Sequence, residues 1–191
     1  MLNVTGDVSQ KILSATFELL SMHGYANVSM RDIAKKSGIA VSQITYYYKT
    51  KENLLVEVIK EANREYLSEL DQKLEGICLP NEKMKFIFDW LEKLITEKTA
   101  LYRLLLDFYS LATWNEEIRK EFKSYFNETV SLLCKNLNHV LLKNTHLGSY
   151  SHRQIAKLIA GAGFGVAMQY VMDENNTEAV SSLKIIRDFF S

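Results

Sequence analysis

The sequence has few of the residues that interrupt helices or cross-link small proteins. Its 191 residues include one proline, eight glycines and two cysteines. Cys78 and Cys134 form no CxxC pattern, so we expect reduced thiols rather than a disulfide scaffold. Long helices meet few breakers in such a chain, and its apolar residues repeat at helical spacing. The composition therefore favours an all-α fold over a β-sandwich or barrel.

Long hydrophobic runs are also missing. The longest uncharged run covers the fifteen residues from Leu158 to Met172. This is shorter than the roughly 20 residues that a membrane-spanning helix needs. The first seven residues lack the basic and apolar regions of a signal peptide. We therefore expect a cytoplasmic protein with no membrane partner.

The chain has no net charge, because 23 lysines and arginines balance 23 aspartates and glutamates. The charges are unevenly distributed, however. Residues 1–51 contain six basic and three acidic residues, whereas the remainder contains 17 basic and 20 acidic residues. A positive excess in one segment is a weak indication of a polyanionic partner for that segment.

The most informative stretch, residues 29–51, has the spacing of a helix-turn-helix. Two short helices that cross steeply need a small residue at the crossing, which Ala34 supplies, and a turn residue that tolerates positive φ, which Gly38 supplies. Ile33 and Ile44 face inward from the two helices. The same positions would also fit an αα-hairpin inside a helical bundle, so the pattern alone leaves that alternative open.

Polar side chains on this helix pair are suited to DNA. Hydroxyl and amide groups on the second helix can approach base edges in a major groove, and glutamine can pair bidentately with adenine. The free amides at the start of the first helix favour an anion, and a lysine follows where a phosphate would pass. We therefore expect DNA contacts from Ser29, Arg31, Val41, Ser42, Gln43, Thr45, Tyr46, Tyr47 and Lys51.

Over residues 10–59 the chain resembles the TetR family of bacterial transcriptional regulators. The shared features are Gly24-Tyr25 followed by Ser29, the Asp32-Ile33-Ala34 step, the Tyr47-Tyr48 pair and the Lys51-Glu52-x-Leu54 ending. Two positions depart from the family pattern. Ala40 stands where the family usually has a serine or similar cap, and Gln43-Ile44-Thr45 replaces a threonine-leucine-tyrosine run. The operator sequence therefore does not follow from the resemblance.

The resemblance implies a one-component regulator, most often a repressor. Such a protein binds a palindromic operator in double-stranded DNA as a homodimer and is released by a small-molecule effector. Residues 1–51 would form a three-helix DNA-binding domain, and residues 52–191 a larger ligand-binding and dimerisation domain, with about nine helices in all. Residues 158–190 also look like the last two helices of the subgroup that includes the choline-responsive regulators, with Ala162 in place of an aspartate.

Small and apolar residues near the carboxyl end predict a dimer interface. Glycines let a second helix approach closely, and two such helices facing their symmetry mates would form a four-helix interface. We expect contacts at Gly161, Phe164, Gly165, Met168, Ile186 and Phe190. The glycines could instead pack within one subunit, and the sequence leaves this alternative open.

The middle helices are rich in aromatic residues, most of which are expected in the core. Asp107 stands out inside an apolar run. Its carboxylate is expected in solvent, paired with Arg103, but it could also face a bound cation. The sharper hypothesis is an aromatic cage for a cationic ligand. The candidate ligand-binding residues are Trp90, Asp107, Tyr109, Trp114 and Met168.

No metal, cofactor or catalytic site is expected. The four histidines lack metal-ligand spacing, and no serine, cysteine or carboxylate stands in a recognisable catalytic arrangement. The glycines between residues 161 and 165 do not form a phosphate loop, because no Lys-Ser/Thr follows them. The remaining alternative is an all-α ligand-binding protein or enzyme whose helix-turn-helix is structural. That alternative predicts no salt-dependent binding to DNA.

Overall fold

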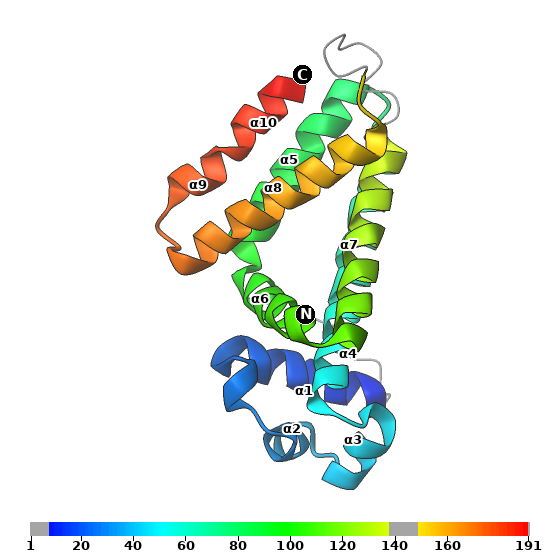
Figure 1. Ribbon diagram of the computed structural model, residues 1–191, viewed down its shortest axis with the longest axis vertical. Coiled ribbons are helices and arrows are strands. Elements are labelled where there is room, and N and C mark those ends of the chain that lie inside the picture. Colours follow the sequence, from blue (N-terminus) through cyan, green and yellow to red (C-terminus); the bar gives the residue numbers. More distant parts are fainter. Residues whose placement is uncertain (1–7, 138–148, 191) are drawn as a thin grey trace. The chain divides into compact units, whose positions relative to one another are not determined.

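The computed structural model describes residues 8–137 and 149–190, and within these ranges it contains only helices (Figure 1). The predicted all-α class is therefore confirmed. The chain divides into two compact units. The first unit comprises Met1–Arg64 and Arg103–Phe122, and the second comprises Glu65–Tyr102 and Lys123–Ser191.

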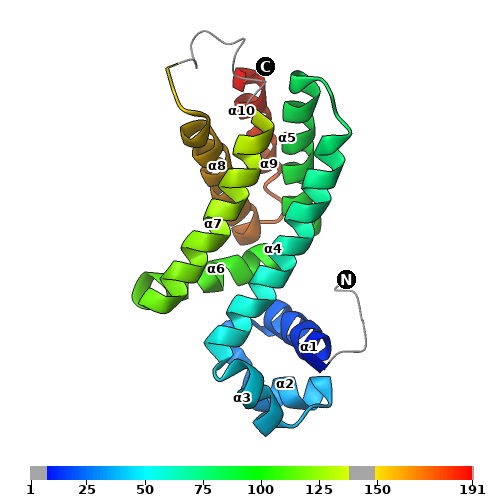
Figure 2. The ribbon, with the colours of Figure 1, turned by 90° about the vertical axis from the view of Figure 1, so that its right-hand side faces the viewer.

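The first unit begins with four short elements. These are α1 (Val8–His23), the 3-10 helix η1 (Tyr25–Asn27), α2 (Met30–Ser37) and α3 (Val41–Tyr48). Helix α2 packs against both α1 and α3 (Figure 2). Ile12 and Leu20 of α1 are almost completely buried, because apolar residues at helical spacing share one face of that helix.

The ends of α2 follow from local chemistry. The Ser29 hydroxyl accepts a hydrogen bond from the Asp32 amide, and the Asp32 carboxylate accepts one from the Ser29 amide at 2.8 Å. This capping box lowers the pKa of Asp32, since hydrogen bonds from Ser29 favour the charged carboxylate. At the other end, Gly38 has φ +71° and closes the helix in the left-handed conformation. Ala40 precedes helix α3 as its N-cap residue and makes no side-chain capping bond.

Three longer helices complete the first unit: α4 (Lys51–Glu75), α6 (Thr99–Trp114) and α7 (Glu116–Leu137), each of which continues in the second unit. The corner between α6 and α7 is capped from both sides. Asn115 Oδ1 accepts from the Glu117 amide at 2.9 Å, and the Arg119 guanidinium donates to the carbonyls of Ala112 and Thr113 at 3.0 and 2.8 Å.

The second unit contains α5 (Pro80–Glu97), α8 (His152–Met172), α9 (Thr177–Ser181) and α10 (Leu183–Phe190). Helices α5, α8 and α10 contact one another, as both ribbon views show (Figures 1 and 2). The described ranges contain ten α-helices where about nine were expected, since a turn at Ser182 divides the last predicted helix.

Helix α8 is longer than the uncharged run that the sequence shows, because it also includes residues 152–157. Within the part of the chain that the structure describes, it is long and apolar enough to cross a membrane by length and composition. Core helices of soluble proteins pass the same test, so this is weak evidence. Helix α8 packs on α5, α9 and α10, and Ile155, Ala156 and Ile159 on its packed face are buried.

Candidate nucleic-acid interface

The pair α2–α3 has a small apolar interior and a polar outer surface. Ile33 and Ile44 are completely buried and Ala34 is nearly so. The six predicted contact residues on α3 are all exposed: Val41, Ser42, Gln43, Thr45, Tyr46 and Tyr47. The structure therefore brings these six together on one short helix that is anchored through Ile44. Hydroxyl, amide and aromatic groups are thereby available to a partner.

Two tyrosines dominate this surface. Tyr46 is 81% exposed and Tyr47 is 53% exposed, and their rings pack edge to face with centroids 5.5 Å apart. Tyr48 is turned toward the interior, where its hydroxyl lies 2.7 Å from the Ser9 hydroxyl. A rigid pair of exposed hydroxyl-bearing rings is suited to contacts with a sugar-phosphate backbone.

The two predicted contacts on the amino-terminal side of α2 differ in their availability. Arg31 is exposed. Ser29 is exposed as well, but its hydroxyl donates to the Asp32 carboxylate at 2.5 Å and accepts from the Asp32 amide. The side chain of Ser29 is therefore occupied by the capping box.

The placement of Lys51 argues against the predicted phosphate contact. Its ammonium group donates to the carbonyls of Tyr25 at 2.7 Å and Val28 at 2.8 Å, and it lies 4.0 Å from the centroid of the Tyr25 ring. These bonds satisfy carbonyls of the connection between α1 and α2. Lys51 thus stabilises the helix-turn-helix from inside, and a phosphate would have to compete with two short hydrogen bonds.

Tyr25 is held by a second group of contacts. Its hydroxyl donates to Glu52 at 2.6 Å, and its amide donates to the Asp107 carboxylate on α6 at 3.0 Å. Burial and the nearby Glu52 carboxylate raise the pKa of Tyr25, while the hydrogen bond from Tyr25 lowers the pKa of Glu52. Asp107 is half-buried. The expectation that it lies in solvent is therefore wrong, because a backbone amide of the first unit takes up its carboxylate.

The connection between α3 and α4 is a strained turn at Lys49. This residue has φ +62° and ψ −58°, and it is the non-glycine residue with positive φ among the described residues. The Thr50 amide donates to the Tyr48 carbonyl at 2.7 Å across it, which makes Lys49 the centre of a γ-turn. Such a conformation costs about 1–3 kcal/mol and persists only where its surroundings impose it.

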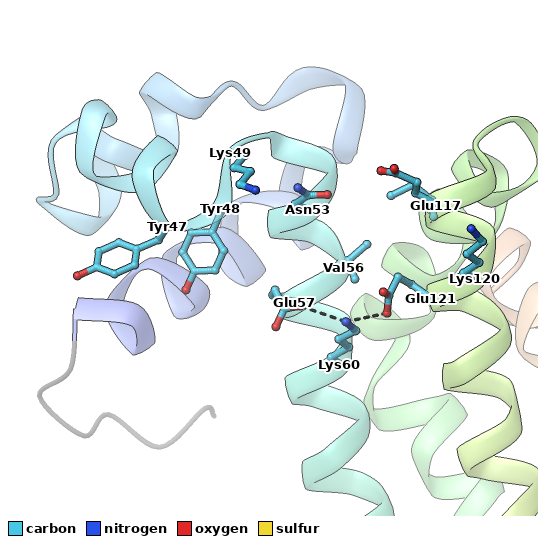
Figure 3. Close-up of a pocket in the computed structure, with 11 residues that line it drawn as sticks. Tyr47, Tyr48, Lys49, Asn53, Val56, Glu57, Lys60, Glu117, Lys120 and Glu121 are labelled. Carbon is cyan, nitrogen blue, oxygen red and sulfur yellow. Dashed lines mark hydrogen bonds and ion pairs between the residues drawn. The ribbon is translucent and has the colours of Figure 1, made fainter.

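A groove of about 600 Å³ lies beside this turn, between α7 and the segment formed by α3 and the start of α4 (Figure 3). Lys60 spans it, pairing with Glu121 at 2.7 Å and Glu57 at 3.2 Å. Burial lowers the pKa of Lys60, but the hydrogen bonds to the two carboxylates outweigh it, so the pKa is raised overall. Lys49 and Lys120 line opposite walls of the groove.

The predicted aromatic cage does not assemble in either unit. Asp107, Tyr109 and Trp114 belong to the first unit, whereas Trp90 and Met168 belong to the second. Trp114 is 90% exposed, and Tyr109 packs against Phe122 with ring centroids 5.5 Å apart. Met168 is half-buried on α8.

Trp90 takes part in a different aromatic group, within the second unit. It stacks on Phe86, and the Lys73 ammonium lies 4.8 Å from its ring centroid. It also lines a hollow of about 190 Å³. The other residues lining this hollow are Tyr66, Glu69, Lys93, Leu94, Glu97 and Lys98.

The glycines of α8 divide into two kinds. A Cβ atom added to Gly161 or Gly165 would meet nothing within 4 Å, whereas one at Gly163 would lie 2.7 Å from Leu91 of α5. Gly161 and Gly165 therefore face open space and Gly163 packs within the subunit. Phe164, Met168 and Ile186 are half-buried, and the side chain of Phe190 lies outside the described residues.

These helices expose four other large apolar residues, of which the sequence pattern indicates two, Met172 and Phe189, as part of an apolar stripe, and misses Leu158 and Ile185. They are Leu158, Met172, Ile185 and Phe189, each between 59% and 75% exposed. The sequence indicates this surface through its helical spacing. Leu158, Gly161, Gly165 and Met172 are three, four and seven residues apart, so they lie on one face of the helix. Within the described residues, no group of three metal-binding side chains occurs, and His139 and His146 lie outside them.

Comparison with known proteins agrees with the geometry of the amino-terminal segment. Residues 12–58 match the model of the family described as bacterial regulatory proteins, tetR family. The chain is 26% identical over 179 residues to the fatty acid metabolism regulator protein of Bacillus subtilis, covering 90% of this chain and 87% of the other.

Two further relatives are matched over part of their length. The chain is 27% identical over 132 residues to the transcriptional regulator BetI of Agrobacterium fabrum, covering 68% of this chain and 63% of BetI. It is 22% identical, also over 132 residues, to an HTH-type regulator of Xanthobacter autotrophicus, covering 68% of this chain and 65% of the other. The chain thus spans less than two thirds of each of these two relatives.

Solved structures share the fold over nearly the whole chain. FadR from Bacillus halodurans superposes with a TM-score of 0.80 at 20% identity, covering 98% of this chain and 96% of the other. FadR from Bacillus subtilis in complex with stearoyl-CoA gives 0.77 at 19% identity, covering 94% and 96%. A protein from Saccharomonospora viridis in complex with choline gives 0.77 at 17% identity, covering 97% and 96%.

Proposed function

We propose that this protein, whose residues 12–58 match the model of the bacterial tetR family, is a one-component transcriptional regulator of the cytoplasm. In this proposal a homodimer binds a palindromic operator and represses the adjacent genes. A small molecule bound by the second unit releases it. Residues 1–51 carry the contacts to DNA, and residues 52–191 carry the ligand and the dimer interface.

The observation that carries the proposal is the surface of α3. Helix α3 packs inward through Ile44 and Tyr48 and leaves its other polar and aromatic side chains in solvent. Such a helix fits the wide major groove, and its hydroxyl and amide groups can read base edges there. Gln43 is our candidate for base recognition, whereas Tyr46 and Tyr47 are candidates for backbone contacts.

Binding to DNA is tested with duplexes from the region upstream of the gene and with duplexes selected from a random pool. We expect binding whose equilibrium constant falls steeply as salt increases, because phosphate contacts release counterions. Gln43→Ala should change the preferred sequence, whereas Tyr46→Phe should weaken binding to all sequences alike. Binding that does not depend on salt or on sequence would refute the proposal.

The dimer interface is supported by the exposed apolar face of the second unit. Leu158 and Met172 on α8 and Ile185 and Phe189 on α10 are large apolar side chains that a soluble monomer rarely exposes together. A twofold axis beside α8 and α10 would cover them with the same residues of a second copy. Open space at Gly161 and Gly165 would let the two copies of α8 approach closely.

Sedimentation velocity tests this interface. Ile185→Asp should shift the protein from dimer to monomer, since a desolvated carboxylate would face its own symmetry mate. Lys184→Asp is the matched control, because Lys184 is an exposed neighbour on the same helix and its replacement should leave the dimer intact. If both variants stay dimeric, the interface lies elsewhere.

The effector is a small molecule held by the second unit, where Trp90 and Tyr66 border the hollow of about 190 Å³. Proteins that share the fold have been solved with choline and with stearoyl-CoA. We therefore test both compounds for release of a protein–DNA complex. A ligand releases DNA only if it binds the off-DNA state more tightly. Trp90→Ala should abolish the response to the active compound.

A further inference from the structure

The amino-terminal segment has fewer cations available for DNA than its sequence suggests. Helix α3 carries no charged side chain at all. Lys51 is bound to two backbone carbonyls, and Lys36 pairs with Glu18 at 2.8 Å. A helix in a groove lies between two phosphate backbones, and a cation on each flank would strengthen binding to both. Arg31 and Lys35, both exposed, can serve only the α2 flank of α3.

Lys49 stands at the opposite flank, directly after the last residue of α3. Its side chain is exposed, and no partner for its ammonium group occurs among the residues that the structure describes. Figure 3 shows Lys49 at the turn that follows Tyr47 and Tyr48, at the edge of the groove. It is therefore a cation placed to serve the carboxyl-terminal end of α3.

The backbone at Lys49 supports a role for the side chain outside the fold. Glycine adopts positive φ without steric cost, and a lysine adopts it only with strain. Among the described residues, the exposed Lys49 ammonium group gains no hydrogen bond or ion pair in return. The Lys49 amide closes α3 by donating to the Thr45 carbonyl at 2.9 Å, but this backbone bond does not require a lysine side chain. A strained residue whose charged side chain has no partner in the fold is a candidate for a functional contact.

We infer that Lys49 binds a backbone phosphate of the operator, and that the γ-turn between α3 and α4 fixes its ammonium group beside the recognition helix. The inference rests on the proposed DNA binding. It assigns to Lys49 the phosphate contact that sequence reasoning gave to Lys51. The contact is electrostatic and independent of sequence, so it contributes affinity and not specificity.

Four variants separate charge from strain. Lys49→Ala removes the charge and keeps the strained backbone, whereas Lys49→Gly removes both. Lys49→Arg keeps the charge. Lys120→Ala is the matched control, because Lys120 is an exposed lysine on the opposite wall of the same groove. Each variant is titrated against the duplex selected by the wild-type protein, at a series of salt concentrations, and its melting temperature is measured without DNA.

We expect Lys49→Ala and Lys49→Gly to reduce the slope of log K against log salt by about 0.9 per protomer. Lys49→Arg and Lys120→Ala should keep the wild-type slope. Without DNA, Lys49→Gly should melt roughly 2–4 °C above Lys49→Ala, since glycine relieves the strain.

Three results would overturn the inference while leaving DNA binding itself in place. Unchanged slopes in Lys49→Ala and Lys49→Gly would show that no phosphate is bound there. If Lys120→Ala reduced the salt slope as much as Lys49→Ala, the effect would come from the overall charge of the protein and not from a contact at Lys49. A drop in melting temperature without a change of slope would make Lys49 a structural residue at the end of α3. If the wild-type protein binds no duplex with a salt dependence, the proposed function fails, and the inference fails with it.

Discussion

The exposed faces of α3 and of the pair α8–α10 are opposites in chemistry. On α3 the exposed side chains are hydroxyls, an amide and two tyrosines, and the residue that anchors the helix is an isoleucine. On α8 and α10 the exposed side chains include Leu158, Met172, Ile185 and Phe189, and the residues that pack inward are small or apolar too. The polar face of α3 can remain in water, whereas the apolar face of α8 and α10 is expected to be buried by another molecule.

This difference determines what each face reveals about its partner. A polar face presents hydrogen-bond donors and acceptors, and their identity limits which kinds of molecule can bind. For α3 we propose that these are the base edges and phosphates of DNA. An apolar face displays only area and shape, so it indicates that a partner exists without naming it. The second copy of the chain follows from symmetry and from the open space at Gly161 and Gly165, and not from any directional bond.

The largest effect is expected from removing the anchor of the polar face. Ile44→Ala should lower the free energy of unfolding by about 2–5 kcal/mol, because it leaves a cavity at a completely buried position. Urea denaturation followed by circular dichroism measures the change. Val41→Ala, at a position 37% exposed on the same helix, should stay within about 0.5 kcal/mol of the wild type. Equal denaturation midpoints in the two variants would contradict the anchoring role.

Much of the polar face could be predicted from sequence because its determinants are local. The capping box at Ser29 and the turn at Gly38 depend on residues within a few positions, and Gly38 has the positive φ that the sequence predicts. The positions of Lys51 and Asp107 could not be predicted. Lys51 bonds to a carbonyl 26 residues away, and Asp107 to an amide 82 residues away. Such pairings depend on tertiary packing, which no local spacing reports.

The apolar face is tested by two alanine substitutions on one helix. Gly163→Ala places a methyl group 2.7 Å from Leu91 and should destabilise the second unit, whereas Gly161→Ala meets open space within the subunit and gains helix propensity. The two variants should differ by about 1–3 kcal/mol in unfolding free energy at equal protein concentration. Identical stabilities would mean that the two glycines do not face different surroundings.

Within the first unit, Asp107→Leu tests the hydrogen bond between the Tyr25 amide and the Asp107 carboxylate, which the sequence did not predict. The Tyr25 amide loses its acceptor, which should lower the free energy of unfolding by about 1–2 kcal/mol. Hydrogen exchange at the Tyr25 amide should accelerate in parallel. Asp107→Asn keeps an acceptor oxygen, so its free energy of unfolding should fall by less. Unaltered exchange at Tyr25 in the leucine variant would mean that this bond does not form in solution.

The smallest effect is a pH dependence carried by Tyr25 and Glu52. Tyr25→Phe removes the hydroxyl that donates to Glu52, at an expected cost of about 0.5–1.5 kcal/mol near neutral pH. The pKa of Glu52 is lowered in the folded protein, so its contribution is present above the unfolded pKa of about 4.3 and disappears as pH falls through the folded value.

The pKa of Tyr25 is raised, so its contribution is present below about 10 and disappears in stronger alkali. The difference in stability between wild type and Tyr25→Phe should therefore form a plateau at neutral pH and shrink on both sides. Urea titrations across the pH range measure it. A difference that is constant from acid to alkali would show that the Tyr25 hydroxyl and Glu52 do not interact. Tyr25 would then be held by the contacts of its backbone with Lys51 and Asp107.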